Sequence, residues 1–381
     1  MRLPWGYAFK SSKFLSDGKY QIIKMSNVYG SNLDLKRSRS FLNKIDSIEE
    51  HYILKTNEIL ITLTGTVGKK DFGYTYLIKD EPNLLLNQRV GRIIINELVN
   101  PAYAFYQIKM PVFSNQFFEL SKGGTGNQTN VGTKDIDNIL IPLPPTLAEQ
   151  TAIANALSDA DALITSLEKL IEKKRNIKQG AMQKLLQPKE GWEVKRLGEI
   201  AEVATGTTPP TKNLDNYGEE YCFVSPADLG RVKYILNTEK KLSKKGFGIS
   251  RRFPKYSILF TCIGSTIGKS GITNFEMTSN QQINAVFPND SYSTEFLYYS
   301  LNLISEQIKL SASEQALPMI NKTEFEKILI QLPTKEEQTH IASILSDMDN
   351  EITALENKLE KYKKIKLGMM QNLLTGKIRL L

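Results

Sequence analysis

Apolar residues recur with alternating steps of four and three along two long segments of the chain. The first series consists of Ile153, Leu157, Ala160, Ile164, Leu167 and Ile171. The second series consists of Ile341, Leu345, Met348, Ile352, Leu355 and Leu359. This heptad period suits a helix that packs along another helix, so the pattern predicts two coiled-coil helices. The segments 146–149 and 334–337 both fit a capping box, in which Thr and Glu side chains mark the start of a helix.

The two helical segments are copies of one another. Residues 149–186 align with residues 337–374 without a gap at an offset of 188, and 22 of the 38 positions are identical. Weaker similarity extends upstream, where 57–69 parallels 256–269 and 131–146 parallels 320–334. The chain therefore contains an internal repeat, in which a divergent globular part precedes a closely matched helix.

Charge predicts how the two helices pack. Acidic residues dominate the first half of each helix, and lysines and arginine dominate the second half. Antiparallel packing sets acidic against basic halves and suits the helix dipoles, whereas parallel packing aligns like charges. We expect an antiparallel pair within one chain, with a pseudo-twofold axis and a globular domain at each end. Homodimerisation through the seam is the alternative.

Both divergent parts predict mixed α/β domains. Strands are expected at 20–28, 58–64, 74–79, 90–95, 221–225, 257–263 and 283–287. Helices are expected from Asn100, which is followed by proline, and from about Ser293. Their aromatic residues are expected in the core rather than as stacking platforms for bases: Tyr103, Phe105, Tyr106, Phe296, Tyr298 and Tyr299.

The predicted fold class is α+β, with two mixed α/β domains separated by two long antiparallel coiled-coil helices. The expected boundaries are a first domain at 1–145, a first helix at 146–187, a second domain at 188–333, a second helix at 334–375 and a tail at 376–381.

Composition narrows the possible partners. Charged residues make up 24% of the chain and hydrophobic residues 41%, and no run is long enough to span a membrane. The segment MRLPWGYAFK has no apolar signal core, so export is not expected. Only two cysteines and two histidines are present, so no zinc site is expected, and reduced thiols fit a cytoplasmic location. The net charge is +8, and both helical segments are close to neutral. The positive excess on the globular parts favours a polyanionic partner, with a generic basic surface as the alternative.

The segment CIGSTIGKS at 262–270 ends like a nucleotide-binding P-loop. Gly264 and Gly268 enclose three residues, whereas a P-loop needs four, and the related turn LTGTVGKK at 63–70 encloses only two. A nucleotide site is therefore not expected. A turn present in both halves is interpreted as framework or as a phosphate contact, and a tight hairpin with positive-φ glycines is an equal alternative.

Polar and basic loops interrupt both domains and supply the residue types that reach phosphates and base edges. The candidates in the first domain are Lys10, Lys13, Thr66, Lys69, Lys70, Asn87, Gln88, Arg89, Lys122, Asn127 and Gln128. Those in the second are Lys212, Lys244, Lys245, Arg251, Arg252, Ser265, Lys269, Asn280, Gln281 and Gln282. No catalytic residue and no metal ligand is assigned, because no complete P-loop, S-adenosylmethionine fingerprint or nuclease metal cluster is recognised.

The chain closely resembles the specificity subunits of type I restriction–modification systems. The resemblance rests on the duplicated EQ-x₂-IA-x₂-LS-x-x-D helices, the preceding ILIPLPP and ILIQLP stretches, the paired glycine turns, WEVKRLGEI at 192–200 and LLTGKIRL near the C-terminus. It implies that two target-recognition domains each read half of a bipartite DNA site. It also implies that the helices set the spacing and dock two methyltransferase subunits, and that restriction subunits then join. The resemblance further implies that the chain itself is not an enzyme, and that S-adenosylmethionine, ATP and Mg²⁺ are bound by its partner subunits.

The first half departs from the family pattern, because it lacks the W-x₄-LGE opening and starts close to GYAFKS. Either its start is truncated, or the C-terminal tail completes the first domain, and the sequence leaves both open. The alternative functions are the specificity subunit of a fused methyltransferase–nuclease (type IIB-like) system and a coiled-coil dimerisation protein with no DNA role.

Overall fold

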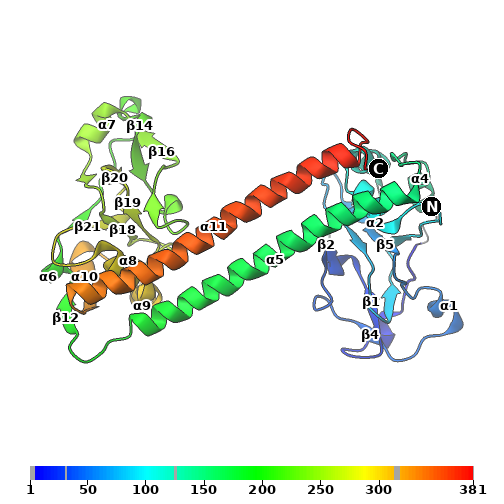
Figure 1. Ribbon diagram of the computed structural model, residues 1–381, viewed down its shortest axis with the longest axis horizontal. Coiled ribbons are helices and arrows are strands. Elements are labelled where there is room, and N and C mark those ends of the chain that lie inside the picture. Colours follow the sequence, from blue (N-terminus) through cyan, green and yellow to red (C-terminus); the bar gives the residue numbers. More distant parts are fainter. Residues whose placement is uncertain (1–4, 31, 124–126, 313–317, 381) are drawn as a thin grey trace. The chain divides into compact units, whose positions relative to one another are not determined.

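The computed structural model describes residues 5–30, 32–123, 127–312 and 318–380. It forms two compact units. Unit 1 contains Met1–Glu168 and Lys358–Leu381, and unit 2 contains Lys169–Asn357. Two helices of 39 residues, α5 (Leu147–Leu185) and α11 (Lys335–Leu373), each contribute one part to each unit (Figure 1).

Within each unit the two helix segments run antiparallel. As the chain moves forward along α5, the ion-pair partner moves backward along α11. The pairs are Asp161–Lys366 and Glu168–Lys363 in unit 1, then Lys174–Glu351 and Lys178–Asp349 in unit 2. The expected antiparallel pair within one chain is therefore confirmed, with acidic halves facing basic halves.

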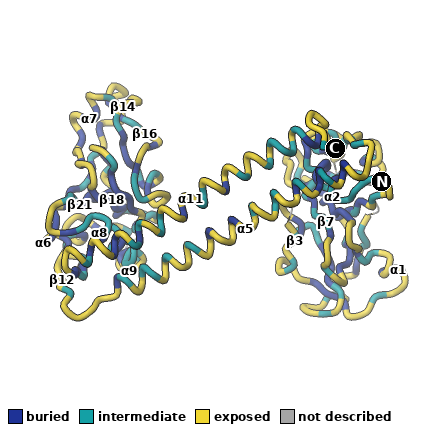
Figure 2. The backbone as a smooth tube through the Cα atoms, viewed as in Figure 1, coloured by how far each residue is buried: buried dark blue, intermediate teal, exposed yellow. Residues whose placement is uncertain are grey.

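All twelve residues of the predicted seam are sheltered from solvent. Eight are buried, and Ala160, Ile164, Met348 and Leu355 are half-buried. The remaining positions of both helices are mostly exposed (Figure 2). Near the start of each helix the seam also packs on its domain: Ile153 clusters with Tyr103, and Ile341 clusters with Phe296.

The first domain is built from small sheets and short helices. The sheets have the strand orders β4-β1-β8, β7-β5-β9, β10-β11-β6 and β2-β3. Their bounds are β1 (Tyr20–Ile23), β2 (Val28–Tyr29), β3 (Asn32–Leu33), β4 (Phe41–Leu42), β5 (Ile59–Thr62), β6 (Thr64–Thr66), β7 (Thr75–Leu77), β8 (Leu84–Leu86), β9 (Val90–Ile93), β10 (Lys122–Gly123) and β11 (Gln128–Asn130). The helices are η1 (Ser11–Lys13), η2 (Met25–Asn27), α1 (Ser47–Glu50), α2 (Pro101–Ile108), α3 (Pro111–Glu119) and α4 (Thr133–Ile136).

The second domain has larger sheets, with orders β13-β21-β18-β19-β15, β16-β14-β20-β17 and β12-β22. The strands are β12 (Glu193–Arg196), β13 (Val203–Thr205), β14 (Tyr217–Val224), β15 (Tyr234–Ile235), β16 (Lys240–Leu242), β17 (Arg252–Phe253), β18 (Ile258–Thr261), β19 (Ser270–Thr273), β20 (Met277–Ser279), β21 (Ile283–Val286) and β22 (Leu329–Leu332). The helices are α6 (Leu197–Ile200), η3 (Leu214–Asn216), η4 (Pro226–Asp228), α7 (Lys244–Ile249), α8 (Thr294–Leu303), α9 (Ser305–Ala312) and α10 (Lys322–Glu326).

The two domains share their strand pairing. β1 lies between antiparallel β4 and parallel β8, and β14 lies between antiparallel β16 and parallel β20. The registers match as well, since Tyr20 lies opposite Leu42 and Tyr221 lies opposite Leu242. The repeat therefore extends into the divergent domains, where the sequence similarity is weak.

The domain helices begin where the sequence predicts. The Asn100 side chain accepts the Tyr103 N–H at 3.0 Å at the start of α2, and the Ser293 side chain caps α8. The aromatic residues of both helices are buried or half-buried, which confirms the expectation that they belong to the core. None of the helices that the structure describes is long and apolar enough to cross a membrane.

The C-terminal tail packs on the first domain. The Gln107 amide of α2 donates a hydrogen bond to the Leu374 carbonyl at 2.6 Å, and Leu380 joins the apolar cluster around Tyr103 and Tyr106. The Arg379 guanidinium pairs with the Glu149 carboxylate. The tail thus covers part of the first domain.

Candidate nucleic-acid interface

In the first domain the predicted loops meet around one small sheet. Thr66 of β6 lies opposite Gln128 of β11, and Lys122 lies on the neighbouring strand β10. The Leu63 N–H donates a hydrogen bond to the Arg89 carbonyl at 3.0 Å, which brings the loop 87–89 to the same place. The structure therefore groups candidates from three loops that are up to about sixty residues apart in sequence.

In each domain the opening segment lies directly against the loop that carries the candidate amides, which is 87–89 in the first domain and 280–282 in the second. A Cβ atom on Gly6 would come within 1.9 Å of the Asn87 carbonyl oxygen, and one on Gly206 within 2.2 Å of the Asn280 carbonyl oxygen. Only glycine permits such an approach of two backbones. Sequence reasoning missed this pair of glycines.

Lys10 and Lys13 lie on the same opening segment of the first domain, in or beside η1. Both side chains are exposed, and Lys13 Nζ lies 3.9 Å from a Glu49 carboxylate oxygen. The loop 87–89 follows β8, and the Gln88 N–H donates to the Tyr7 carbonyl at 2.9 Å. The two lysines are thus a few residues from the grouped loops.

The second domain gathers an equivalent set. The Cys262 N–H donates to the Gln282 carbonyl at 2.8 Å, and the Thr208 hydroxyl donates to the Gln281 side chain. Arg251 Nη1 donates to the Thr205 carbonyl at 3.1 Å, so this arginine joins the opening segment 205–208. The segment 205–208, the loop 280–282 and Arg251 therefore lie together.

Four further cations of the second domain are exposed around α7 and β17. Lys245 contacts Asp215 at 3.2 Å, and Arg252 contacts Glu276 at 3.9 Å. Both members of each ion pair have side chains that are at least half exposed. Exposed pairs of this kind are weak, so these cations remain available to another anion. Lys212 and Lys244 have no ion-pair partner within the described ranges.

The repeated glycine turn is a tight turn in both domains. Gly68, Gly264 and Gly268 have φ values of +74°, +84° and +96°, which only glycine adopts easily. The Lys269 N–H donates to the Thr266 carbonyl at 3.2 Å, and Ser270 then begins the strand β19. A P-loop leads into a helix, so the structure agrees that CIGSTIGKS is not a nucleotide site.

The side chains of these turns differ in how free they are. Lys69 and Lys269 are exposed and without an ion pair in the described part of the chain, and Ser265 is exposed. Lys70 Nζ lies 5.2 Å from the centre of the Phe118 ring. The Thr66 backbone and hydroxyl hydrogen-bond the Asp71 carboxylate and hold its pKa below the usual value. Thr66 is thus already engaged within the turn.

Glu149 and Gln150, and their counterparts Glu337 and Gln338, attach each long helix to its domain. The Gln150 side chain accepts the Asn100 N–H at 2.8 Å and donates to the Pro144 carbonyl at 3.1 Å. The Gln338 side chain makes the same pair of bonds, to the Ser293 N–H and the Pro333 carbonyl, each at 2.9 Å. Sequence reasoning missed this role, although the retained Glu-Gln pair was its signal.

The predicted capping boxes form only in part. The Thr146 and Thr334 hydroxyl oxygens accept the N–H groups of Glu149 and Glu337 at 3.2 and 3.3 Å. The glutamates do not complete the box, because Glu149 turns to Arg379 and Glu337 pairs with Lys189 at 2.9 Å. A cation competes better for a carboxylate than a neutral N–H does.

A second duplicated contact joins both long helices to the domain helix. The Tyr106 hydroxyl donates to Asp161 at 2.8 Å, and Lys366 pairs with the same carboxylate. In unit 2 the Tyr299 hydroxyl donates to Asp349 at 2.6 Å, and Lys178 pairs with that carboxylate at 2.5 Å. Burial, reinforced by the neighbouring carboxylate, raises the pKa of Tyr106 and that of Tyr299.

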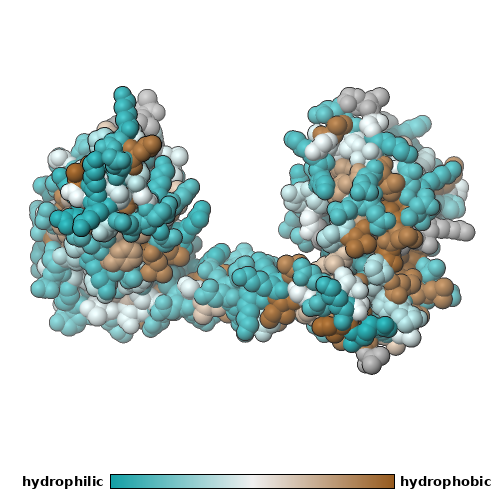
Figure 3. Space-filling view, turned by 90° about the horizontal axis from the view of Figure 1, so that it is seen from above, coloured by the Kyte–Doolittle hydropathy of each residue, from teal (hydrophilic) through white to brown (hydrophobic). Residues whose placement is uncertain are grey.

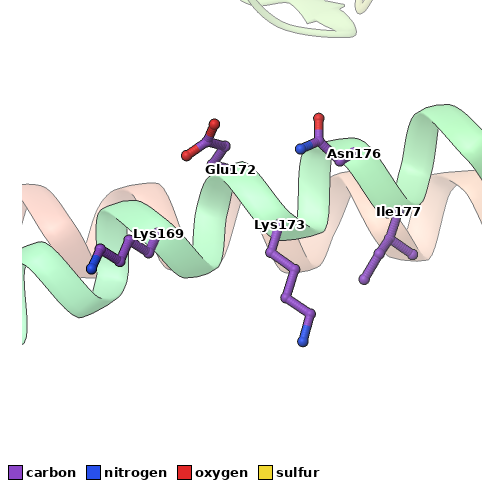
Figure 4. A pocket seen from close by; sticks show the side chains of 5 residues that line it. All are labelled: Lys169, Glu172, Lys173, Asn176 and Ile177. Carbon is purple, nitrogen blue, oxygen red and sulfur yellow. The ribbon is translucent and has the colours of Figure 1, made fainter. Parts of the chain in front are cut away.

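The outer face of α5 is polar with apolar side chains interspersed. Figure 4 shows the five side chains that line a shallow depression there: Lys169, Glu172, Lys173, Asn176 and Ile177. Unit 1 has exposed apolar side chains as well, including Leu98 and Leu140, and Figure 3 shows apolar patches on its surface. No group of three or more His, Cys, Asp or Glu side chains comes together as a metal site within the described residues.

Known proteins share this organisation. A family model described as the type I restriction modification DNA specificity domain matches residues 5–179 and again residues 189–366. The putative type I restriction enzyme MjaX specificity subunit of Methanocaldococcus jannaschii is 27% identical over 390 residues, which cover 94% of this chain and 87% of that protein. The HindI specificity subunit of Haemophilus influenzae is 32% identical over 197 residues, which cover 49% of this chain and 42% of that protein.

Solved structures show the same fold. The type I restriction–modification S subunit from M. genitalium has a TM-score of 0.64 at 18% identity, and the match covers 98% of this chain and 93% of that one. A structure titled for the complex assembly and conformational transition of the type I system has a TM-score of 0.55 at 17% identity, covering 93% and 91%. With its recognition domains and long helices both present twice, the chain belongs to the type I restriction modification DNA specificity domain family and is a specificity subunit with two recognition domains.

Proposed function

We propose that this specificity subunit binds a bipartite duplex DNA sequence, with one recognition domain reading each half-site. The observation that carries the proposal is the contrast within the repeat: the helices match at 22 of 38 positions, whereas the loops of the two domains differ. Retained helices suit a constant spacing and a constant docking surface. Unlike loops suit two unlike half-sites, because direct readout depends on the side chains that face the base edges.

The candidate residues divide by chemistry into two roles. The exposed cations, among them Lys69, Lys269 and Arg252, are proposed to contact phosphates. The amide side chains of 87–88, 127–128 and 280–282 are proposed to reach base edges, since Asn and Gln pair well with adenine in the major groove. The grouping of these loops around one place in each domain supports the proposal.

Partner subunits are proposed to supply the catalysis. Two methyltransferase subunits would dock on the long helices, and the half-exposed Ile177 on the outer face of α5 offers an apolar contact for one of them. Restriction subunits would then join the complex. S-adenosylmethionine, ATP and Mg²⁺ would belong to these partners, and a target adenine would flip into a methyltransferase pocket. The DNA that this chain is proposed to bind and its two unpaired cysteines favour a location in the cytoplasm.

A binding-site selection tests the function. The full chain, together with a type I methyltransferase subunit that co-purifies with it, is incubated with random duplexes, and the bound duplexes are sequenced. We expect two short specified sequences of about three to five base pairs each, separated by an unspecified gap of constant length. The methyltransferase subunit alone is the control and should enrich no such pair. A single uninterrupted site, or no enrichment, would contradict the proposal.

A further inference from the structure

The segment between β3 and β4 of the first domain carries three cations within four residues. Lys36, Arg37 and Arg39, here called the basic loop, all have exposed side chains. Lys36 and Arg37 have no ion pair in the part of the chain that the structure describes. Arg39 has one ion pair, with Asp17 at 3.6 Å, in which both side chains are more than half exposed, and its guanidinium lies 5.2 Å from the centre of the Phe41 ring. The basic loop is thus left without effective internal neutralisation.

The backbone of this segment is nevertheless held firmly. The side chain of Asn27, which is fully buried, donates hydrogen bonds to the carbonyls of Asp34 at 2.9 Å and Arg37 at 2.5 Å. The buried Gln21 side chain donates to the Leu35 carbonyl at 2.7 Å. Asn27 is itself fixed, because its side-chain oxygen accepts the Lys24 N–H at 2.8 Å.

A fixed backbone with free cationic side chains is a preorganised surface for a polyanion. Three like charges in four residues repel one another, and an anionic partner relieves that repulsion. The side-chain amides of Asn27 and Gln21 already order the backbone of the basic loop in the folded domain. Binding of a polyanion therefore loses little further backbone entropy.

The second domain places its charge differently on the same framework. The corresponding segment before β16, residues 236–239, reads Leu-Asn-Thr-Glu and has no cation. The short helix that follows, α7, begins with Lys244 and Lys245, whereas its counterpart α1 in the first domain contains Glu49 and Glu50. Each domain therefore has a cationic element next to its matched antiparallel strand. In the first domain the basic loop precedes β4, and in the second domain Lys244 and Lys245 follow β16.

We propose that the basic loop of the first domain binds the phosphate backbone of duplex DNA, and that Lys244 and Lys245 take this role in the second domain. The inference rests on the proposed function of the chain as a reader of duplex DNA. It assigns to the basic loop a contribution to affinity and to salt dependence, and none to sequence preference.

A charge-neutral variant tests the basic loop. In the full chain Lys36, Arg37 and Arg39 are replaced together by glutamine, which leaves the main-chain carbonyls that Asn27 and Gln21 bind. Binding to the selected duplex and to a scrambled duplex is measured from low to moderate salt. We expect affinity to fall at least about tenfold, and the slope of log K against log salt to become shallower by about two to three, since each phosphate contact contributes about 0.9. The selected sequence should not change.

The matched control removes three lysines from another part of unit 1. Lys19, Lys55 and Lys79 of the first domain are exposed and lie outside the long helices, and their replacement by glutamine changes the net charge equally. An equal loss in both variants would overturn the inference, because net charge alone would then explain it. Unchanged affinity in the basic-loop variant, or an altered half-site, would also overturn it.

The outcome for the unmodified chain separates this inference from the proposed function. If that chain binds duplexes without sequence preference and the basic-loop variant still loses affinity, the phosphate contact stands and sequence reading fails. If the unmodified chain binds no duplex, both are refuted. Selective binding that the substitutions leave unchanged refutes the basic loop alone.

Discussion

At the scale of single residues, the glutamine that both copies of the repeat retain makes the same hydrogen bonds in both domains. Gln150 and Gln338 each connect the first turn of a long helix to a backbone N–H and a proline carbonyl of the adjoining domain. Both side chains are almost fully buried. Truncating either would leave buried polar groups unpaired, which costs more than an ordinary hydrogen bond contributes. This explains why the glutamine is the same in both helices.

Lys109 is a residue whose charge opposes folding. It lies at the end of α2, with Nζ 3.7 Å from the centre of the Phe105 ring, and burial, together with the nearby Lys366 charge, lowers its pKa to about 8. In the unfolded chain the amine titrates near its ordinary value of 10.5. Below pH 8 the folded state therefore holds a poorly solvated cation, and this penalty disappears as the pH rises from about 8 to 10.5.

We predict that Lys109→Met stabilises unit 1 at pH 7 by about 1 kcal/mol, less than the pKa shift alone implies because the cation–π contact is also lost. The gain should shrink between pH 8 and pH 10. Hydrogen exchange of the α2 amides at pH 7 and at pH 10 measures the gain in stability and its loss at high pH. The exposed Lys134→Met is the control. A Met variant that exchanges faster at pH 7 would contradict the assignment.

At the scale of elements, the helix pair is held by an apolar seam and by ion pairs of unequal value. Lys178 and Asp349 are each only 24% exposed, and Asp349 also accepts the Tyr299 hydroxyl. The pair Arg175–Glu356 is more exposed, at 62% and 42%. Charged pairs near the surface contribute little, whereas removing one partner of a sheltered pair leaves the other charge and the hydroxyl unsatisfied.

We predict that Asp349→Ala lowers the stability of unit 2 by about 2–3 kcal/mol, whereas Glu356→Ala lowers it by less than about 1 kcal/mol. The chain has two tryptophans, and Trp192 lies in unit 2, where it packs on Phe296. Urea unfolding of the full chain in a Trp5→Phe background can therefore be followed by Trp192 fluorescence. Equal effects of the two substitutions would show that the Tyr299–Asp349–Lys178 contact has no special weight.

At the scale of the whole molecule, the chain consists of two copies of one family domain, each with its own core and its own set of loops. The contacts that attach each domain to the helices use side chains that both copies retain, such as Gln150 and Gln338. The candidate loops make few bonds to the helices. The recognition domains are therefore proposed to be exchangeable units at 1–145 and 188–333.

We predict that replacing residues 1–145 with the corresponding domain of another specificity subunit changes one half-site and leaves the other half-site and the gap unchanged. Profiling of methylated sites in cells that carry the exchanged chain and its methyltransferase partner measures this. The reciprocal exchange at 188–333 is the control and should change the opposite half-site. Changes in both half-sites after one exchange would contradict modular reading.

The sequence by itself determined the repeat, the two long helices and their antiparallel direction. Heptad spacing, segregated charge and duplicated motifs are patterns in the linear sequence, and they do not depend on how the domains pack. It also determined the starts of α2 and α8, because Asn100 and Ser293 cap a helix through bonds to residues three positions away. Local chemistry decided these features.

Only the tertiary structure decided which distant residues meet. Glu149 pairs with Arg379 rather than with its own capping box, and Gln107 binds the backbone of Leu374. The basic loop gains its significance from Asn27 and Gln21, whose buried amides bind its carbonyls. No periodicity relates such partners, since each contact depends on how separate elements pack and on which polar groups that packing removes from water.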